Sequence, residues 1–280
     1  MATISLFRRQ LVFSSNNLLT CPKNLSLTKQ RWTTIRNVCS KSEKFTKVEM
    51  EAMPKHVAIC LDGNRRWCEA RGHGIDYKPF FHKNVVFTQL CLKWGIPHAT
   101  SLMWGLSNFT KRTPEASNFF LGQFQEFIED NLEFFKREGI KVRIIGETTL
   151  LSKSIQETIK QVEEETKKKK RLELALTVCY TGQRDITNAT RKLCEKVKEG
   201  VIEPYDITED MIQNELSIPS SPIPDLFIRT GGEFRVGGLL SWQVSHIELF
   251  FTDVMAPDFG EHLFIDALRS YLLRSRKFGK

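Results

Sequence analysis

The chain has 280 residues, of which 41% are hydrophobic and 26% charged, a composition typical of a globular protein with a sizeable core. No apolar run approaches the roughly 18 to 20 residues that span a bilayer, so we expect no integral membrane segment. The formal net charge is +8, but residues 1–42 hold seven Lys or Arg and no acid, which leaves 34 basic and 33 acidic side chains in the rest. Such a nearly neutral body disfavours a nucleic-acid partner, because holding a phosphate polymer needs many cations on one face.

The N-terminal segment has the composition of a targeting peptide. Residues 1–42 also contain eleven Ser or Thr, and a hydroxyl-rich, Arg-bearing and acid-free composition is typical of an organellar transit peptide. We predict that residues 1–45 form an organellar transit peptide, with a disordered basic tail as the alternative. Composition alone leaves the plastid (chloroplast) and the mitochondrion open, and the plastid is the location that we expect. Residues 53–280 are predicted to form a single domain. The seven scattered cysteines, odd in number and without a C-x-x-C pair, are expected to be reduced thiols, mostly in the core.

From residue 53 onward, β-type runs alternate with stretches of helical period, which predicts an α/β fold with an open, mostly parallel sheet flanked by helices. The predicted strands are 57–61, 99–104, 141–145, 172–179, 226–228 and 247–251. The predicted helices are 79–94, 114–137, 152–170, 185–199 and 261–274. The Pro- and Ser-rich stretch 219–224 predicts a loop. The basic run 167–171 follows an acidic stretch and is expected to be a solvated helix end.

The first candidate site follows the first predicted strand. HVAICL at 56–61 leads into DGNRRW at 62–67, which then becomes helical. A strand that leads into Gly and two Arg at a helix start can bind an anion through free backbone N–H groups and guanidinium groups. Asp62 beside these cations would repel phosphate unless a divalent cation lay between them, so Asp62 is a candidate Mg²⁺ ligand. The alternative is an Asp-Gly turn beside two solvated arginines.

A second segment of the same kind begins at residue 225. DLFIRTGGEFR at 225–235 contains a short apolar strand that delivers Arg229 and a Gly pair into a loop, with Arg235 six residues further on. Because loops at the carboxyl ends of parallel strands can face one crevice, the two segments predict two anion sites together, for two phosphorylated ligands or one long one. Glu248, at the start of the last strand, could supply a second carboxylate to a metal; the alternative is an ordinary strand-end Glu.

These segments resemble the cis-prenyltransferases, also called the undecaprenyl diphosphate synthase family, from about residue 53 to the C-terminus. The resemblance rests on HVAICLDGNRRW at 56–67, PDLFIRTGGEFR at 224–235, WQVSHIELFFTDVMAPDFG at 242–260 and SRKFG at 275–279. It implies an open, mostly parallel sheet with helices around it and a hydrophobic tunnel, a homodimer, and Mg²⁺ as the cofactor.

The resemblance also implies roles for individual residues. Asp62 would hold Mg²⁺ and assist departure of the allylic diphosphate, Asn108 would be a second catalytic residue, and Glu248 a second metal ligand. The expected diphosphate-binding residues are Gly63, Asn64, Arg65, Arg66, Trp67, Arg71, Lys111, Arg229, Arg235 and Gly237. Arg229, Arg235 and Glu248 fall where the family binds its second, homoallylic substrate.

The chain departs from the family pattern at three places. Where the family usually has AFSTENWxRPxxE, it reads MWGLSNFTKRTPE at 103–115, which keeps Asn108 and Glu115 but replaces Ser-Thr-Glu by Gly-Leu-Ser and the Arg by Lys111. The GHxxG that usually follows the first helix is absent. The usual RxSN reads RVGG at 235–238, so Gly237 lacks a hydroxyl expected to bond the second diphosphate. The losses gather around substrate activation and the second site.

The retained first segment and the altered second site predict an enzyme with an unusual second substrate. If that site takes a second dimethylallyl diphosphate in place of isopentenyl diphosphate, the internal alkene carbon attacks and gives a branched ten-carbon product. The pattern is similar to that of the plant branch of the family which makes lavandulyl diphosphate by this head-to-middle coupling. A neryl or other short-chain cis-prenyl diphosphate synthase that uses isopentenyl diphosphate is the first alternative. A non-catalytic partner subunit of a cis-prenyltransferase is the second.

Bulky rings favour a short product. The predicted helix from residue 114 and the helix before it carry rings on or near one face, and rings there fill volume that a long product would need. These residues are Phe80, Phe81, Phe87, Phe119, Phe120, Phe124 and Phe127. The alternative is that the rings are simply core.

Overall fold

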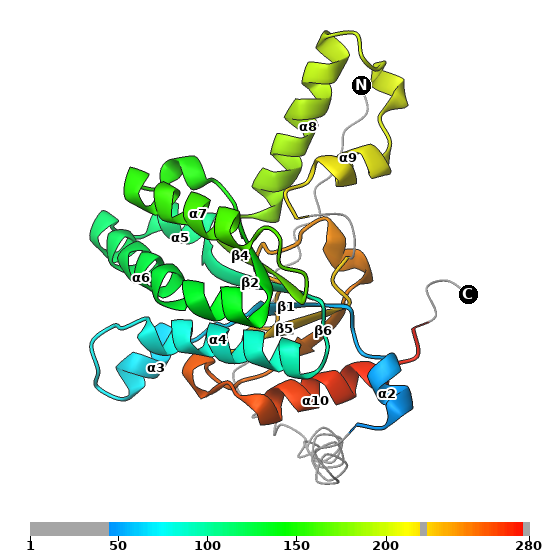
Figure 1. The fold of residues 1–280 in the computed structure, drawn as a ribbon. Coiled ribbons are helices and arrows are strands. Elements are labelled where there is room, and N and C mark those ends of the chain that lie inside the picture. The colour runs from blue at the N-terminus through cyan, green and yellow to red at the C-terminus, as the bar shows by residue number, and fades with distance from the viewer. Residues whose placement is uncertain (1–44, 219–222, 277–280) are drawn as a thin grey trace, which may run out of the picture. The chain divides into compact units, whose positions relative to one another are not determined.

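The structure is a computed structural model that describes residues 45–218 and 223–276 (Figure 1). Most of the predicted transit peptide (residues 1–44) and part of the predicted loop (219–222) lie outside the described residues. The strands are β1 (His56–Cys60), β2 (His98–Gly105), β3 (Ile140–Ile145), β4 (Leu172–Tyr180), β5 (Leu226–Arg229) and β6 (Glu248–Phe251). The α-helices are α2 (Lys47–Glu51), α3 (Asn64–Ala70), α4 (Lys78–Lys93), α5 (Leu106–Lys111), α6 (Pro114–Glu138), α7 (Lys153–Thr166), α8 (Gly182–Lys198), α9 (Glu209–Glu215) and α10 (Glu261–Leu272). Short 3₁₀ segments are η1 (Thr148–Leu150), η2 (Pro204–Asp206), η3 (Gln243–His246) and η4 (Ala256–Asp258).

The described strands form one sheet in the order β3-β4-β2-β1-β5-β6, and every pairing in it is parallel. Helices flank this sheet, so the predicted α/β fold is confirmed (Figure 1). β1 pairs with β2 on one side and with β5 on the other. The loops that follow β1 and β5 therefore leave the same edge of the sheet as neighbours.

Alternate residues of β1 face two separate cores. Val57 and Ile59 belong to the larger core, together with the buried faces of α4, α6, α7 and α10. Ala58 and Cys60 belong to a smaller core, together with Phe227 of β5. Because successive side chains of a strand point to opposite faces, this division means that β1 is buried on both sides. A strand buried in this way holds its carboxyl end in a fixed position.

Helix α6 is stabilised by capping at both ends as well as by its buried face. Thr113 precedes it and accepts a hydrogen bond from Ala116 N (3.3 Å), and Pro114 occupies the first helical position. Gly139 ends it in the left-handed region with φ of 72°. The helix therefore begins at a defined point directly after α5, which matters for the site described below.

The predicted strands agree with the structure to within one residue at each end, whereas two helices were predicted too long. Helix α10 ends at Leu272 rather than at residue 274. Helix α7 ends at Thr166 rather than at residue 170. Thr166 Oγ1 donates to Val162 O (2.7 Å) and accepts from Val142 N of β3 (3.1 Å), which ties the helix end to the sheet. The basic run that follows is largely exposed, as expected. The short helices α2, α5 and α9 were not predicted.

Helices α8 and α9 pack against each other and project away from the sheet (Figure 1). Thr181 precedes α8 and accepts a hydrogen bond from Arg184 N (3.2 Å), so this helix begins three residues before the predicted start. Among the described residues, no helix is long and apolar enough to cross a membrane. The described cysteines are free thiols, of which Cys60, Cys68, Cys91 and Cys179 are buried; Cys21 and Cys39 lie outside the described residues.

Gly146 after β3 has a backbone that side chains do not tolerate. Its φ is 135°, and a Cβ there would lie 1.9 Å from Val178 O. We predict that Gly146→Ala lowers the free energy of unfolding by about 2 kcal/mol or more, measured by urea denaturation. Gly122→Ala in α6 is the matched control, because no atom lies within 4 Å of the added Cβ. That control is expected to be stabilising by about 0.5–1 kcal/mol, and equal effects of the two variants would contradict the prediction.

Candidate active site

Hydrogen bonds join the loops that follow β1 and β5. Cys60 lies opposite Arg229 in the β1–β5 pairing, so Asp62 and Thr230 leave the sheet together. Thr230 Oγ1 accepts a hydrogen bond from Asp62 N (2.8 Å) and donates one to Asp62 O (2.9 Å). Gly231, with φ of 85°, packs so closely that a Cβ there would lie 2.9 Å from the Asp62 carbonyl oxygen. These contacts hold the two predicted anion-binding segments against each other.

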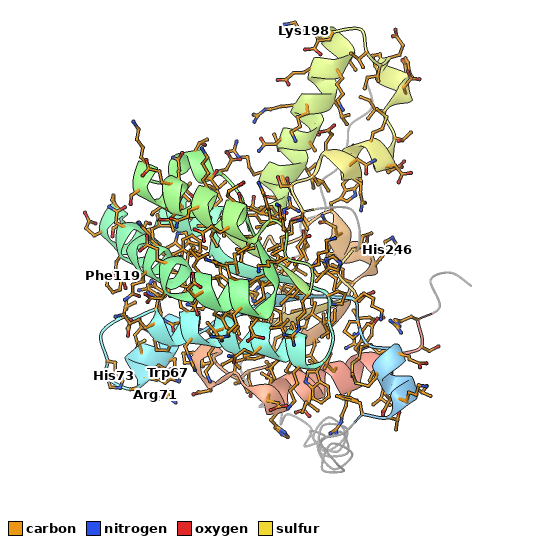
Figure 2. The ribbon with its side chains drawn as sticks, viewed as in Figure 1. Trp67, Arg71, His73, Phe119, Lys198 and His246 are labelled. Carbon is orange, nitrogen blue, oxygen red and sulfur yellow. The ribbon has the colours of Figure 1, made fainter. Side chains whose placement is uncertain are left out.

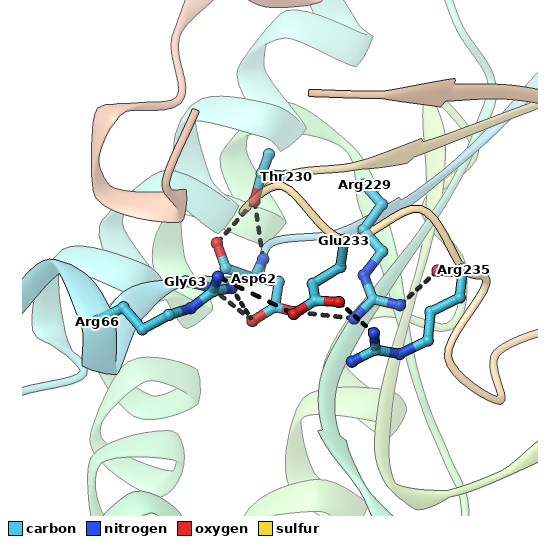
Figure 3. A network of polar contacts seen from close by, with 7 residues as sticks. All are labelled: Asp62, Gly63, Arg66, Arg229, Thr230, Glu233 and Arg235. Carbon is cyan, nitrogen blue, oxygen red and sulfur yellow. Dashed lines mark hydrogen bonds and ion pairs between the residues drawn. The ribbon is translucent and has the colours of Figure 1, made fainter. Parts of the chain in front are cut away.

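The carboxylate of Asp62 has a donor at each oxygen (Figure 3). Gly63 N donates to Oδ1 at 2.6 Å, and Arg229 Nη2 donates to Oδ2 at 2.8 Å. Arg66 Nη2 lies 3.6 Å from Oδ1. The Arg229 side chain is buried and also donates to the carbonyl oxygen of Arg235. Asp62 and Arg229, which were predicted to serve different substrates, therefore share one ion pair.

Glu233 extends this network and was not singled out in the sequence. Its carboxylate accepts a hydrogen bond from Arg235 Nη1, and its Oε1 lies 4.0 Å from Arg66 Nη1. Its position between the two candidate residues Arg229 and Arg235, in RTGGEFR, was the feature of the sequence that could have indicated a role in the site. Together with Asp62 and Arg229 these residues form one connected group of two carboxylates and three guanidinium groups (Figure 3).

A cavity of about 320 Å³ opens beside this network. It is lined by Leu61, Asp62, Gly63, Asn64, Arg65, Arg66, Glu69, Tyr77, Phe80, Met103, Trp104, Asn108, Arg112 and Phe120. One part of the wall is apolar: Trp104 and Phe120 stack with centroids 4.1 Å apart, and Tyr77 meets Phe120 edge-on at 5.0 Å. The cavity thus combines a charged wall with a tightly packed aromatic one.

The phenylalanines singled out in the sequence divide into three groups. Phe80 and Phe120 line the cavity. Phe81, Phe87, Phe124 and Phe127 are buried in the core and do not line the cavity, as the alternative expected. Phe119 was expected on or near the same face, but its side chain is 47% exposed and lies at the surface (Figure 2). Only the first group bears directly on the length of a bound chain.

Trp67 and Arg71, predicted to bind diphosphate, are not among the residues that line the cavity. Both lie beside His73, in and just after α3 (Figure 2). Trp67 Nε1 donates to Asp258 Oδ1 at 2.9 Å, and Arg71 Nη2 lies 3.5 Å from Asp258 Oδ2. The Arg71 guanidinium lies over the Trp67 ring at 4.2 Å, and the His73 ring stacks on the same indole at 6.4 Å. In this arrangement Trp67 and Arg71 join α3 to η4.

Two further predicted residues are not brought to the Asp62 cluster. Lys111 is exposed and is not part of the cavity lining, whereas its neighbour Arg112 is. Glu248 accepts a hydrogen bond from Arg274 Nη1 at 2.5 Å, so within this chain the carboxylate pairs with a cation beyond α10. The other predicted catalytic residue, Asn108, lines the cavity with Asp62.

Burial sets the protonation of two groups near the cavity. Burial raises the pKa of the Cys60 thiol to about 12, although the charge of Arg229 opposes this. Burial also raises the pKa of Tyr77, and the nearby charges of Arg112 and Arg65 oppose the increase. Both groups are therefore protonated near neutral pH, and the Tyr77 hydroxyl is available as a hydrogen-bond donor.

The oxygen atoms beside the arginines suit a hard cation. Asn64 Oδ1 is buried and has no hydrogen-bond partner in the described part of the chain, while its Nδ2 donates to Asp76 O at 2.7 Å. The Asp62 carboxylate and this amide oxygen are ligand types that Mg²⁺ prefers. No group of three His, Cys, Asp or Glu side chains that could hold a metal occurs among the described residues. Mg²⁺ usually needs only one or two carboxylates plus substrate phosphates, so the residues present fit it.

An open parallel sheet with a basic cavity at the carboxyl ends of two neighbouring strands is the arrangement of an α/β enzyme with an anionic ligand. The family model of the undecaprenyl diphosphate synthases matches residues 60–279. The chain therefore belongs to the cis-prenyltransferases, a family of prenyl-transferring enzymes.

Relatives and solved structures agree with this assignment. A chloroplastic (2Z,6Z)-farnesyl diphosphate synthase of Solanum lycopersicum is 36% identical over 97% of this chain and 96% of its own length. A chloroplastic cis-prenyltransferase of the same plant is 39% identical over 82% of this chain and 76% of its own. The crystal structure of lavandulyl diphosphate synthase from Lavandula x intermedia, in complex with dimethylallyl diphosphate, superposes with a TM-score of 0.79. It is 32% identical and covers 82% of this chain and 100% of its own.

Gly237 adjoins the buried guanidinium of Arg229. Its φ is 77°, and a Cβ there would lie 2.7 Å from Arg229 Nη1. Gly238 has a similar φ of 93°, but its added Cβ would meet only Thr181 Cβ at 4.0 Å. We predict that Gly237→Ser lowers the free energy of unfolding more than Gly238→Ser. In both variants a serine must adopt a left-handed backbone conformation, which costs about 1–2 kcal/mol, but only Gly237→Ser also displaces Arg229. Denaturant titration of both variants measures the difference. An equal loss of unfolding free energy in the two variants would contradict the prediction.

Proposed function

We propose that this chain is a short-chain prenyl diphosphate synthase that couples two dimethylallyl diphosphates head to middle, with Mg²⁺, to form lavandulyl diphosphate. The cavity beside Asp62 supports the short prenyl diphosphate, because its charged wall suits a diphosphate and its aromatic wall leaves room for a short prenyl chain. The observation that carries the choice of the second substrate is Gly237, which lacks the hydroxyl of the family pattern. The cavity volume of about 320 Å³ is at the lower end of the roughly 300–1,000 Å³ of ligand pockets. The likeness to a lavandulyl diphosphate synthase in complex with dimethylallyl diphosphate supports the same substrate.

The first dimethylallyl diphosphate binds with its diphosphate against the charged wall. Arg65 and Arg66 present guanidinium groups to the phosphate oxygens. Asp62 and the Asn64 amide oxygen would hold Mg²⁺, which would supply further positive charge beside the diphosphate. As the bond between C1 and the diphosphate oxygen breaks, the fixed guanidinium groups stabilise the charge that develops on the leaving group. Asn108 lines the same cavity and positions the reacting chain.

The second dimethylallyl diphosphate supplies the alkene. Arg229 and Arg235 bind its diphosphate, and Gly237 offers no hydroxyl to it. A site that lacks this donor discriminates less in favour of isopentenyl diphosphate, because such specificity depends on polar groups that only one ligand satisfies. The internal alkene carbon bonds to C1 of the first substrate as its diphosphate leaves. Loss of a proton from an adjacent methyl group then gives a branched ten-carbon diphosphate.

Ordinary cis-elongation with isopentenyl diphosphate is the second candidate. The similarity to a (2Z,6Z)-farnesyl diphosphate synthase over 97% of the chain favours it. The aromatic wall suits a short product in either case, so the two candidates differ in the second substrate and not in the cavity. The nature of the product separates them.

A plastid location and a homodimer belong to the proposal. Relatives from Solanum lycopersicum are chloroplastic, which supports the reading of residues 1–45 as a plastid transit peptide. Phe234 is 75% exposed, and its ring lies 5.9 Å from that of Phe251 on the edge strand β6. An exposed ring beside β6, the edge strand of the described sheet, is a surface that a second copy would cover.

Dimethylallyl diphosphate alone, with Mg²⁺, is predicted to be a sufficient substrate. The expected product after dephosphorylation is a branched ten-carbon alcohol, identified by gas chromatography and mass spectrometry. An absolute requirement for isopentenyl diphosphate, with nerol or a longer linear alcohol as the product, would establish cis-elongation instead. A purified chain without activity on any five-carbon diphosphate would support the partner-subunit alternative.

Asp62→Asn is predicted to reduce turnover by about 10²–10³-fold or more, because the leaving diphosphate loses its metal-binding carboxylate. The amide keeps an oxygen that can accept the hydrogen bond from Arg229, so the variant is expected to remain folded by circular dichroism. Asp258→Asn is the control, since this carboxylate contacts Trp67 outside the cavity lining. Wild-type rates for Asp62→Asn at saturating Mg²⁺ would refute the assignment of Asp62.

A further inference from the structure

We infer that Arg112 and Tyr77 form a further binding site for the diphosphate of a prenyl substrate, the role that the sequence resemblance gave to Lys111. The inference rests on the proposed function, because it takes the ligand of the cavity to be a prenyl diphosphate. It assigns the cation to a position where the family pattern has Pro, one residue after the position where that pattern has Arg.

The side chain of Arg112 is held by two aromatic residues of the cavity wall. Its guanidinium lies over the Trp104 ring at 4.8 Å, and its Nη1 donates to the Tyr77 hydroxyl at 3.3 Å. All three side chains line the cavity that contains Asp62. Lys111 is exposed, and no polar partner of its side chain is recorded among the described residues.

The junction between two helices explains why Arg112 and not Lys111 faces the cavity. Helix α5 ends at Lys111, and Arg112 has an extended backbone with φ of −92° and ψ of 163°. Thr113 is also extended and precedes Pro114, which disfavours a helical conformation for the residue before it. The chain therefore leaves the helical path at Arg112, and the side chains of Lys111 and Arg112 have different surroundings.

Tyr77, which accepts the hydrogen bond from Arg112, is itself fixed by hydrogen bonds and burial. Its backbone N–H donates to Gln123 Oε1 of α6 at 2.9 Å, and Gln123 Nε2 donates to Asp76 Oδ1 at 3.0 Å. The Tyr77 side chain is 6% exposed. Because Tyr77 and Trp104 already hold the Arg112 side chain, it loses little conformational entropy when it binds a ligand.

The chemistry of the pair suits a diphosphate. A guanidinium has five N–H donors, and the hydrogen bond from Arg112 to Tyr77 uses one of them. The remaining donors can bind two phosphate oxygens at once. The neutral Tyr77 hydroxyl can donate its own proton to a third oxygen. Arg65 lies close enough to Tyr77 for its charge to act on the same hydroxyl. Arg65, Tyr77 and Arg112 line the same cavity, so the three side chains can bind one ligand.

Calorimetric titration of the full chain with inorganic pyrophosphate and Mg²⁺ tests the inference. Arg112→Gln is expected to weaken binding by about tenfold or more, as the loss of a charge-assisted pair implies. Arg112→Lys is expected to lose less, because it keeps the charge but not the fork. Lys111→Gln is the matched control and is expected to bind within about twofold of wild type. Tyr77→Phe, which keeps the ring and removes the hydroxyl, is expected to weaken binding by a few-fold.

Pyrophosphate has no prenyl group, so this measurement is independent of the product. Unchanged binding in Arg112→Gln, or a larger loss in Lys111→Gln, would overturn the inference even if the branched product forms. If cis-elongation is found instead, the binding pattern of the four variants still decides the role of Arg112. Should Arg112→Gln fail to fold, the contrast between Tyr77→Phe and Lys111→Gln decides, and equal binding in these two would overturn the inference.

Discussion

The parallel register of β1 and β5, with Cys60 opposite Arg229, brings together two loops whose ion-paired residues are 167 positions apart in the chain. Because side chains alternate along a strand, a slip of one residue would turn Arg229 into the opposite core and leave Asp62 without its partner. The close packing of the β1 side chains in two different cores disfavours such a slip. The hydroxyl of Thr230 then ties the loops together beyond the last strand pair. The charged network and the cavity beside it depend on this alignment.

The fold could be predicted because its signals are local. Parallel strands buried on both faces appear as nearly continuous apolar runs, and their ends were found to within one residue. Helix ends were harder where a tertiary contact decides them: Thr166 stops α7 by bonding to β3, and nothing near it in the sequence indicates that bond. The short helix α5 has no buried residue. A six-residue helix of this kind gives no amphipathic period to detect.

Within the site, sequence identified the segments better than the individual side chains. Asn64, Arg65 and Arg66 at the start of α3 all line the cavity, whereas Trp67 of the same motif does not. Trp67 instead packs against Asp258, a contact between distant segments that the spacing of the motif does not encode. Lys111 and Arg112 have different surroundings because α5 ends at Lys111 and the backbone is extended at Arg112. Glu233 was not predicted, because its contact with Arg66 joins two segments that are far apart in the sequence. Its carboxylate balances the charge of the arginines that it contacts.

The pairing of Asp62 and Glu233 with Arg66, Arg229 and Arg235 means that the ligand-free network carries an excess of one positive charge. A diphosphate that binds here must therefore replace Asp62 and Glu233 as the partner of the arginines. The free energy of binding is then the difference between the new ion pairs and those that are broken. Fewer small counterions need to leave than for bare arginines. The dependence of substrate affinity on ionic strength is accordingly shallower than the number of arginines would imply.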